Sequence, residues 1–470
     1  MMRVRSLSVL GILVIAACAE PPVTPSSVGK TISGPVLASA NSGSSDRYLI
    51  NFKNNQVSAD LAGRVAALGG TVEAAYDGVG VAVVVGLTAT GAASLSDLGD
   101  VGSDETFQIL DPNMKVEVEA VADAVSPSSS SDPTTASRYA RQWDMRQIKA
   151  NVAWAAGKRG SSSVKVAIVD TGIDDAYPDL QGRVDLANSK SFVPSDDALV
   201  ASLFPSRHVT TDLHFHGTHV AMTVASNSNI LAGVTTQTML MAVKVIGVSG
   251  SGSISGILAG IVYAADQGAN VINMSLGIAN LPFDMHNKDN KDFFNKVVDR
   301  AFQYAHSKGV TVVVAAGNES QNLDVKQSYK PFCGSKHVIC VSATGPTAGG
   351  TNGPWTNPDA FAFYSNFGLN QIDVAAPGGN SGGSVWSGCS TTSLQIPVCQ
   401  TGTFIVNAIG TSMASPHVAG LAALLAAEQN GRASGAIRSS IFNADDLGDP
   451  GNDARYGNGR INVARALGLE

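Results

Sequence analysis

Charged side chains are scarce in this sequence of 470 residues, at 15% against about a quarter in an average soluble domain. The 38 acidic residues outnumber the 31 basic ones, and the net charge of -7 does not suit the broad positive face of a nucleic-acid-binding protein. Aromatic residues are also few, at 6%, yet a hydrophobic content of 44% excludes a disordered chain. Glycine is abundant, with 49 residues, and serves either flexible linkers or tight turns.

The sequence also lacks an apolar run long enough to cross a bilayer as a helix. Residues 1–5 are basic and residues 7–17 form a short apolar run, which is the layout of an export signal. The run ends Ile-Ala-Ala-Cys and resembles the lipobox of bacterial lipoproteins, so we expect Cys18 to carry a lipid. Ordinary cleavage after Ala17 or Ala19 is the alternative. We therefore expect an exported protein that is either secreted or held in the bacterial cell envelope only by a lipid anchor.

Cysteine is rare too, and setting Cys18 aside leaves four residues, which allow three disulfide pairings. The nearest pairs in sequence are Cys333 with Cys340 and Cys389 with Cys399, each of which would close a short loop. In an oxidising compartment each bond would contribute about 2 to 3 kcal/mol by restricting the unfolded chain. Neither pair has the close CxxC spacing of zinc sites, so disulfides are the favoured interpretation.

The first third of the chain divides by composition. After the signal at residues 1–18, residues 19–45 are a tether rich in Pro, Ser and Gly, and residues 112–137 are an exposed linker that a protease could cut. Residues 46–111 lie between them and show strand-helix-strand-strand-helix-strand signals, which predict a small α+β ferredoxin-like domain. The expected elements are 47–52, 58–68, 70–76, 79–87, 92–98 and 106–110.

Residues 138–470 show a different pattern, in which apolar, branched strands alternate with helices. This pattern predicts an α/β domain with a mostly parallel sheet and an active site at the carboxyl ends of its strands. The strands are expected at 164–169, 239–245, 270–274 and 310–315, with helices at 255–267 and 293–308.

Three motifs in this second part carry polar residues suited to catalysis. A predicted strand runs directly into Asp170, His216 stands in Phe-His-Gly-Thr-His, and Ser412 stands in Gly-Thr-Ser-Met-Ala-Ser-Pro. Each has an ordinary interpretation when taken alone, because Asp caps helices and turns and histidines are common in protein cores. With His214 included, the histidines could also be zinc ligands, but no HExxH pattern accompanies them.

Taken together and in this order, the three motifs resemble those of the subtilisin-like serine peptidases, the subtilases, over residues 138–470. The resemblance implies that Asp170 orients His216, that His216 acts as general base and then acid, and that Ser412 is the nucleophile. A fourth segment, Ala-Ala-Gly-Asn, matches the family's oxyanion motif, so Asn318 would donate its amide to the tetrahedral intermediate. An Asn after Gly is otherwise a common turn residue.

The resemblance also implies where substrate lies. Two segments would clasp an extended peptide as neighbouring strands, a plain flexible loop being the less favoured interpretation of the first. A third would form one wall of the pocket for the residue before the scissile bond. The residues concerned are Gly250 and Gly252, then Ser275, Leu276 and Gly277, and finally Ala315 and Gly317. The floor of that pocket is expected from residues 327–331.

Catalysis by such a triad requires no cofactor, and no metal is expected at the catalytic residues. Structural calcium is the one candidate, because many subtilases bind it and Asp179 stands at one such position. The stretch 225–233 is shorter than the usual calcium loop, which argues against that site.

By the same resemblance, residues 46–111 are an inhibitor-type propeptide, and the mature enzyme starts around residues 142–154. The sequence therefore predicts an exported serine endopeptidase made as a zymogen, with protein or peptide substrates, its own propeptide as inhibitor and no nucleic-acid partner. One alternative is a catalytically inactive envelope binding module with the same fold, and filled catalytic positions argue against it. Another is an esterase, but Ser412 lacks the GxSxG elbow.

Overall fold

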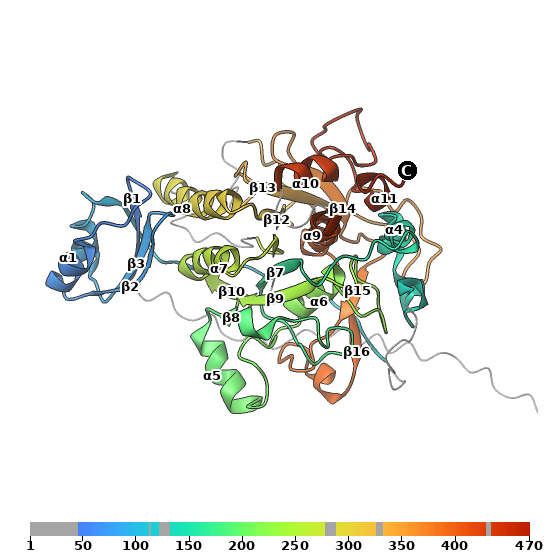
Figure 1. Ribbon diagram of the computed structural model, residues 1–470, viewed down its shortest axis with the longest axis horizontal. Helices are drawn as coiled ribbons and strands as arrows, with labels where there is room; N and C mark the ends of the chain where they lie inside the picture. The colour runs from blue at the N-terminus through green and yellow to red at the C-terminus, as the bar shows by residue number, and fades with distance from the viewer. Residues whose placement is uncertain (1–45, 112–113, 122–131, 278–287, 326–331, 429–433) are drawn as a thin grey trace, which may run out of the picture.

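The computed structural model describes residues 46–111, 114–121, 132–277, 288–325, 332–428 and 434–470, which form a small N-terminal domain beside a much larger one (Figure 1). The expected signal with Cys18 and the tether lie outside these residues. Among the described residues, no helix combines the length and the apolar character that a membrane span needs.

A seven-stranded parallel sheet forms the centre of the large domain, as the apolar strand pattern predicts. Side chains alternate between its two faces, so Val166 and Ile168 enter one hydrophobic core while Ala167 and Val169 enter the other. The strand order across the sheet is β14 (Val374–Pro377), β13 (Val338–Thr344), β12 (Thr311–Ala315), β11 (Val271–Met274), β7 (Lys165–Asp170), β9 (Met239–Lys244) and β8 (Lys190–Ser191).

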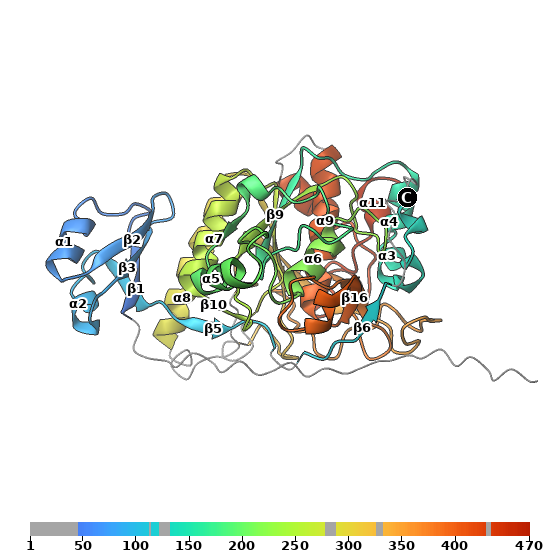
Figure 2. The same ribbon diagram turned by 90° about the horizontal axis from the view of Figure 1, so that it is seen from below.

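Helices cover both faces of this sheet, which confirms the α/β fold class (Figures 1 and 2). One core contains α6 (His216–Val224) and α9 (Thr411–Glu428), which pack against each other. The other contains α7 (Ile254–Asp266) and α8 (Lys288–Ser307). The remaining helices of the large domain are α3 (Trp143–Gln147), α4 (Ala150–Ala155), α5 (Pro194–Leu203), α10 (Ser434–Ile441) and α11 (Val463–Ala466).

The small domain is a four-stranded antiparallel sheet in the order β2-β3-β1-β4, with two helices on one face. Ile50, Phe52 and Leu61 contribute to its own core, whereas Leu49 and Val83 face α7 and α8 of the large domain. The elements are β1 (Arg47–Phe52), α1 (Leu61–Ala67), β2 (Thr71–Tyr76), β3 (Val81–Val85), α2 (Ala89–Ala93) and β4 (Gly99–Ser103).

Two expectations about the small domain are wrong. The second helix begins earlier than residue 92, because the Thr88 side chain accepts a hydrogen bond from Gly91 N and caps it there. The last strand of the sheet is β4, and the segment expected there forms β5 (Thr106–Gln108), which pairs with β10 (Ser251–Ser253) of the large domain. Its apolar residue Phe107 is buried in the core around α7 and α8.

The segment expected to be a linker, 112–137, contains a strand. Residues Val118–Ala120 form β6, which extends an antiparallel sheet of β15 (Val385–Gly388) and β16 (Phe404–Ala408). Figure 2 shows β5 beside β10 and β6 beside β16, at two places on the same side of the large domain.

Both nearest-neighbour cysteine pairings are confirmed. Cys333 is bonded to Cys340, and Cys389 is bonded to Cys399. The first bond joins the segment after β12 to β13, and the second closes the loop between β15 and β16.

Candidate active site

Asp170 and His216 meet at the carboxyl end of the central sheet. Asp170 is the last residue of β7 and His216 is the first of α6, and both side chains are fully buried. Nδ1 of His216 lies 2.8 Å from Oδ1 of Asp170. Because a carboxylate only accepts hydrogen bonds, Nδ1 carries the proton of the neutral ring, which leaves the lone pair on Nε2. No described residue hydrogen-bonds to that Nε2.

Ser412 lies in the first turn of α9, the helix that packs against α6. Its hydroxyl donates a hydrogen bond of 3.1 Å to the main-chain carbonyl of Ser275, which follows β11. The end of β7 and the N-termini of α6 and α9 therefore bring Asp170, His216 and Ser412 into one region. The contact between Ser412 and His216 is not made in this conformation, which is common before substrate binds.

Asn318 is held beside the start of α9 by the residue that precedes the nucleophile. Its side-chain Oδ1 accepts hydrogen bonds of 2.9 Å from both the main-chain N–H and the hydroxyl of Thr411. The Thr411 hydroxyl in turn accepts a 3.0 Å bond from Gly317 N. With Oδ1 engaged in this way, the Nδ2 group remains available as a donor. Sequence reasoning missed Thr411, although its place between Gly410 and Ser412 in the quoted motif was a usable signal.

The predicted glycines of the first substrate segment bind an extended strand in this structure. Gly252 pairs with Phe107 of β5, and Gly250 O accepts hydrogen bonds from the N–H groups of Ile109 and Leu110, at 2.9 and 3.0 Å. Gly250 has a φ of 79°, a backbone conformation that residues other than glycine rarely adopt, so this turn favours glycine.

In the second predicted substrate segment, the side chains of Ser275 and Leu276 face the interior of the domain. The Ser275 side chain points toward α9, where its hydroxyl donates 2.7 Å to Ser412 O, and Leu276 is buried in the core. Only the main chain of these two residues is therefore placed to serve a substrate strand. Gly277 lies next to Gly317.

The pocket wall expected after β12 includes Ala315, the last residue of that strand, which is 4% exposed. The expected pocket floor, 327–331, lies outside the described residues.

Two further histidines near the site, His214 and His219, are buried, and their burial favours the neutral form. Burial lowers the pKa of His214 and of His219 to about 3, with a smaller contribution from nearby His216. His214 stacks on Phe215, and Nε2 of His219 lies 3.2 Å from the carbonyl of Val385. Within the described ranges, no three His, Cys, Asp or Glu side chains converge as metal ligands would.

The residues around Asp179 do not fit a calcium ion. Its carboxylate accepts hydrogen bonds of 2.7 to 3.2 Å from the main-chain N–H groups of Asn229, Ile230 and Leu231. The side-chain oxygen of Gln142 is likewise taken by the N–H of the next loop residue, Ala232, at 2.8 Å. Calcium requires converging oxygens, whereas here N–H donors point at the carboxylate. The shortened loop thus closes on Asp179 directly.

Comparison with known proteins agrees with this arrangement. Residues 161–459 match the subtilase family, Peptidase_S8. The chain is 34% identical over 330 residues to the thermophilic serine proteinase of Bacillus sp. (strain AK1), covering 69% of this chain and 67% of that protein. It is 32% identical over 330 residues to thermitase of Thermoactinomyces vulgaris, covering 70% and 96%.

Among solved structures, the epidermin leader peptide processing serine protease of Staphylococcus aureus has a similar fold. The TM-score is 0.67 at 21% identity, over 91% of this chain and 99% of that one. Together, the family match and the two curated relatives show that the chain belongs to the subtilase family of serine-type peptidases.

Proposed function

We propose that this protein is an exported serine endopeptidase, made as a zymogen, that hydrolyses peptide bonds in proteins through Asp170, His216 and Ser412. The observation that carries the proposal is the buried hydrogen bond between His216 and Asp170, which leaves the Nε2 lone pair of His216 available as a base. A serine hydroxyl is a weak nucleophile unless such a base removes its proton during attack.

In the proposed reaction, Ser412 Oγ turns from Ser275 O toward His216 and attacks the scissile carbonyl carbon. The new C–O bond forms as the Oγ proton passes to Nε2 of His216, while Asp170 stabilises the imidazolium without taking the proton. Nε2 then returns the proton to the leaving amine as the C–N bond breaks, which leaves an acyl-enzyme. Water hydrolyses this ester by the same two proton transfers and releases the acid product and free Ser412.

Negative charge develops on the carbonyl oxygen in each half of this reaction. Nδ2 of Asn318 and the main-chain N–H of Ser412 are the proposed donors to that oxygen. Because Thr411 fixes the Asn318 amide beforehand, these dipoles need no reorganisation at the moment of reaction.

Contacts between the small domain and the large one support the role of residues 46–111 as an inhibitory propeptide. Asp104 accepts hydrogen bonds from the N–H and the hydroxyl of Ser255 in the first turn of α7, at 2.9 and 2.5 Å. Arg300 of α8 donates to the main-chain carbonyls of Phe52 and Gly80. These are the bonds of a docked domain, because they satisfy helix-terminal and strand-end groups of both partners.

The chain that leaves the small domain pairs with two strands of the large domain, β10 and β16. Ile109 and Leu110 bind Gly250 O, as described above, and farther along β6 pairs with β16. Glu117 N donates 2.7 Å to the side chain of Asn407, which lies five residues before Ser412. An external substrate strand would have to displace these segments, so the intact chain is proposed to be inactive until it is cut.

The proposed export rests on residues 1–18, with Cys18 as the lipid-modified residue of an envelope lipoprotein or with cleavage nearby and secretion. Disulfide bonds persist in oxidising compartments, so the two bonds of this chain support a location outside the cytosol. Proposed partners are protein or peptide substrates and the propeptide itself, with no cofactor needed for catalysis.

The test is to express the full chain with its own signal, alongside Ser412→Ala and the control Ser439→Ala, which removes an exposed hydroxyl on α10. We expect the unaltered chain and the control to lose the propeptide and to digest casein, and Ser412→Ala to do neither. Mass spectrometry of the mature N-terminus identifies both the cleavage site and any lipid attached to it. A folded, unaltered chain that is never processed and digests nothing would refute the proposal and favour a binding module.

A further inference from the structure

Asp212 is a fully buried carboxylate in the loop that leads into α6. It accepts five hydrogen bonds, all from residues within two positions of Asp170 or His216 in the sequence. Oδ1 receives the hydroxyl of Thr171 at 2.9 Å and the N–H groups of His214 and Phe215 at 2.9 and 3.1 Å. Oδ2 receives the N–H and the hydroxyl of Thr218, at 2.9 and 2.7 Å.

These donors surround His216 on both sides along the chain. His214 and Phe215 precede it, and Thr218 lies two residues beyond it in α6. Phe215 has a φ of 148°, which non-glycine residues rarely adopt and which persists only where neighbouring contacts hold it. Its N–H is one of the groups bound by Asp212. The carboxylate therefore fixes the backbone conformation from which the His216 side chain leaves the loop.

The same carboxylate reaches the residue after Asp170. Thr171 donates its hydroxyl to Asp212 and accepts the N–H of Gly217 at 2.9 Å, so one side chain joins β7 to the start of α6. A Cβ on Gly217 would lie 2.1 Å from Gly172 O, which shows how closely these two segments approach. Movement of Asp212 would thus change the spacing between Asp170 and His216.

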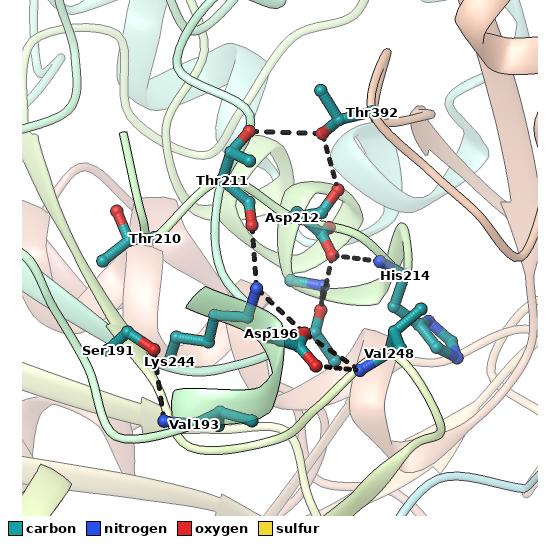
Figure 3. Close-up of polar contacts among 12 residues, drawn as sticks. Ser191, Val193, Asp196, Thr210, Thr211, Asp212, His214, Lys244, Val248 and Thr392 are labelled. Atoms are coloured by element: carbon teal, nitrogen blue, oxygen red, sulfur yellow. Dashed lines mark hydrogen bonds and ion pairs between the residues drawn. The ribbon is translucent and has the colours of Figure 1, made fainter. Parts of the chain in front are cut away.

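A second set of buried contacts holds the Asp212 loop in place (Figure 3). Lys244 Nζ donates 3.0 Å to Thr211 O and forms a buried ion pair of 3.0 Å with Asp196 of α5. On the opposite side, the Thr392 hydroxyl donates 2.9 Å to the main-chain carbonyl of Asp212. The main chain at Thr211 and Asp212 is therefore fixed to the scaffold by side chains other than those that bind the Asp212 carboxylate.

We propose that Asp212 is a positioning residue, which sets the His216 imidazole between Asp170 and Ser412. This inference rests on the proposed peptidase mechanism and adds a group to it. Sequence alone could not find this role, because an Asp in a polar loop is normally a turn or cap residue. Burial raises the pKa of Asp212, and the hydrogen bonds from Thr218, Thr171 and His214 oppose that effect.

The test compares Asp212→Asn with Asp179→Asn. Both remove a buried carboxylate that accepts N–H donors, but Asp179 closes the 229–231 loop, away from the catalytic groups. We expect processed Asp212→Asn to lose roughly 10- to 100-fold in kcat with KM within about threefold, since small displacements of reacting groups cost that much. We also expect its kcat/KM pH profile to shift. Asp179→Asn is expected to lower Tm with kcat and the pH profile unchanged.

A second readout needs no turnover. In the full chain carrying Ser412→Ala, we expect the proton of His216 Nδ1 in its hydrogen bond to Asp170 to give a low-field NMR resonance. We expect Asp212→Asn to shift or broaden that resonance and Asp179→Asn to leave it in place. If the wild-type chain is inactive but this difference holds, the proposed function fails and the positioning role stands.

A folded Asp212→Asn chain with the wild-type resonance, kcat and pH profile would overturn the inference. So would an equal loss in Asp179→Asn. If Asp212→Asn does not fold, Thr171→Val replaces it, because it removes the bridge between Asp212 and Gly217, and Thr171→Ser restores it. Loss in the valine variant with recovery in the serine variant supports the role, and equal behaviour of the two overturns it.

Discussion

Ser275 and Ser412 exchange two hydrogen bonds. The Ser412 hydroxyl donates 3.1 Å to Ser275 O, and the Ser275 hydroxyl donates 2.7 Å to Ser412 O. The Ser275 hydroxyl also contacts Ser415 of α9 and accepts from the Asn273 amide of β11. The proposed nucleophile is thus anchored to the central sheet through its main chain, while its hydroxyl is held by the same neighbour.

Replacing Ser275 by Ala should weaken that anchor. We expect Ser275→Ala to lower the free energy of unfolding by about 1 to 3 kcal/mol, because buried partners lose a hydrogen bond. We also expect kcat to fall by roughly 3- to 10-fold as Ser412 loses a fixed position. Urea denaturation in the Ser412→Ala background and kinetics on the processed enzyme measure the two effects. Ser342→Ala, which removes the hydrogen bond from β13 to Arg455 O, should cost similar stability without loss of kcat.

Replacing Asn318 by Ala should remove a donor to the developing negative charge. We expect kcat to fall by roughly 10²- to 10³-fold with little change in KM, since the donor acts mainly in the transition state. Thr411→Val should give a smaller fall, because it removes the hydroxyl that orients the amide but keeps the main-chain N–H. The control is the exposed Asn443→Ala, and an equal loss of kcat there would contradict the oxyanion role.

Replacing Asp104 by Ala should weaken the hold of the small domain on the large one. The change removes the carboxylate that binds the first turn of α7, together with its ion pair with Arg47. We therefore expect the binding free energy between the two domains to weaken by about 1 to 2 kcal/mol. That corresponds to roughly tenfold weaker inhibition after processing. Peptidase activity should therefore appear earlier in a time course that starts from the full chain. Asp97→Ala breaks an exposed ion pair with Arg64 inside the small domain and should leave the time course unchanged.

The stability of the chain should depend on pH through Asp179. Burial raises its pKa to about 6, above the value of about 3.9 expected in the unfolded chain, although backbone hydrogen bonds oppose this. The folded state therefore binds more protons than the unfolded state between these values. Its contribution is fully present below about pH 4 and is lost as the pH rises through about 6.

Urea denaturation of Ser412→Ala across this range, with and without Asp179→Asn, checks this dependence. We expect the Asn variant to flatten the fall in unfolding free energy between about pH 4 and 6. A calcium chelator should not change the result at Asp179, because N–H donors already occupy its oxygens. A chelator effect that Asp179→Asn abolishes would show instead that the loop binds metal.

Much of the architecture could be predicted because it depends on local pattern. Buried parallel strands appear in the sequence as runs of apolar, branched residues. The polar residue that ends such a strand lies at the edge of the sheet where the neighbouring parallel strands also end. Asp170 therefore lies at the carboxyl end of β7, as predicted. Several of the abundant glycines mark close contacts within the site, as Gly217 against Gly172 shows.

Other features depend on partners distant in sequence. The segment around Phe107 has strand character, but whether it completes the small sheet or pairs with β10 depends on which core buries its apolar side chains. The strand β6 forms only because β16 offers an unpaired edge.

By itself, the sequence determined the family motifs, four strands and two helices of the large domain and the residues proposed for catalysis. The tertiary structure alone decided the hydrogen-bond partner of the Ser412 hydroxyl and the burial of Asp212. The reason is physical: a buried polar group must be satisfied by donors that folding brings together, and those donors come from residues such as Thr171 and Thr218, which no local pattern assigns to Asp212.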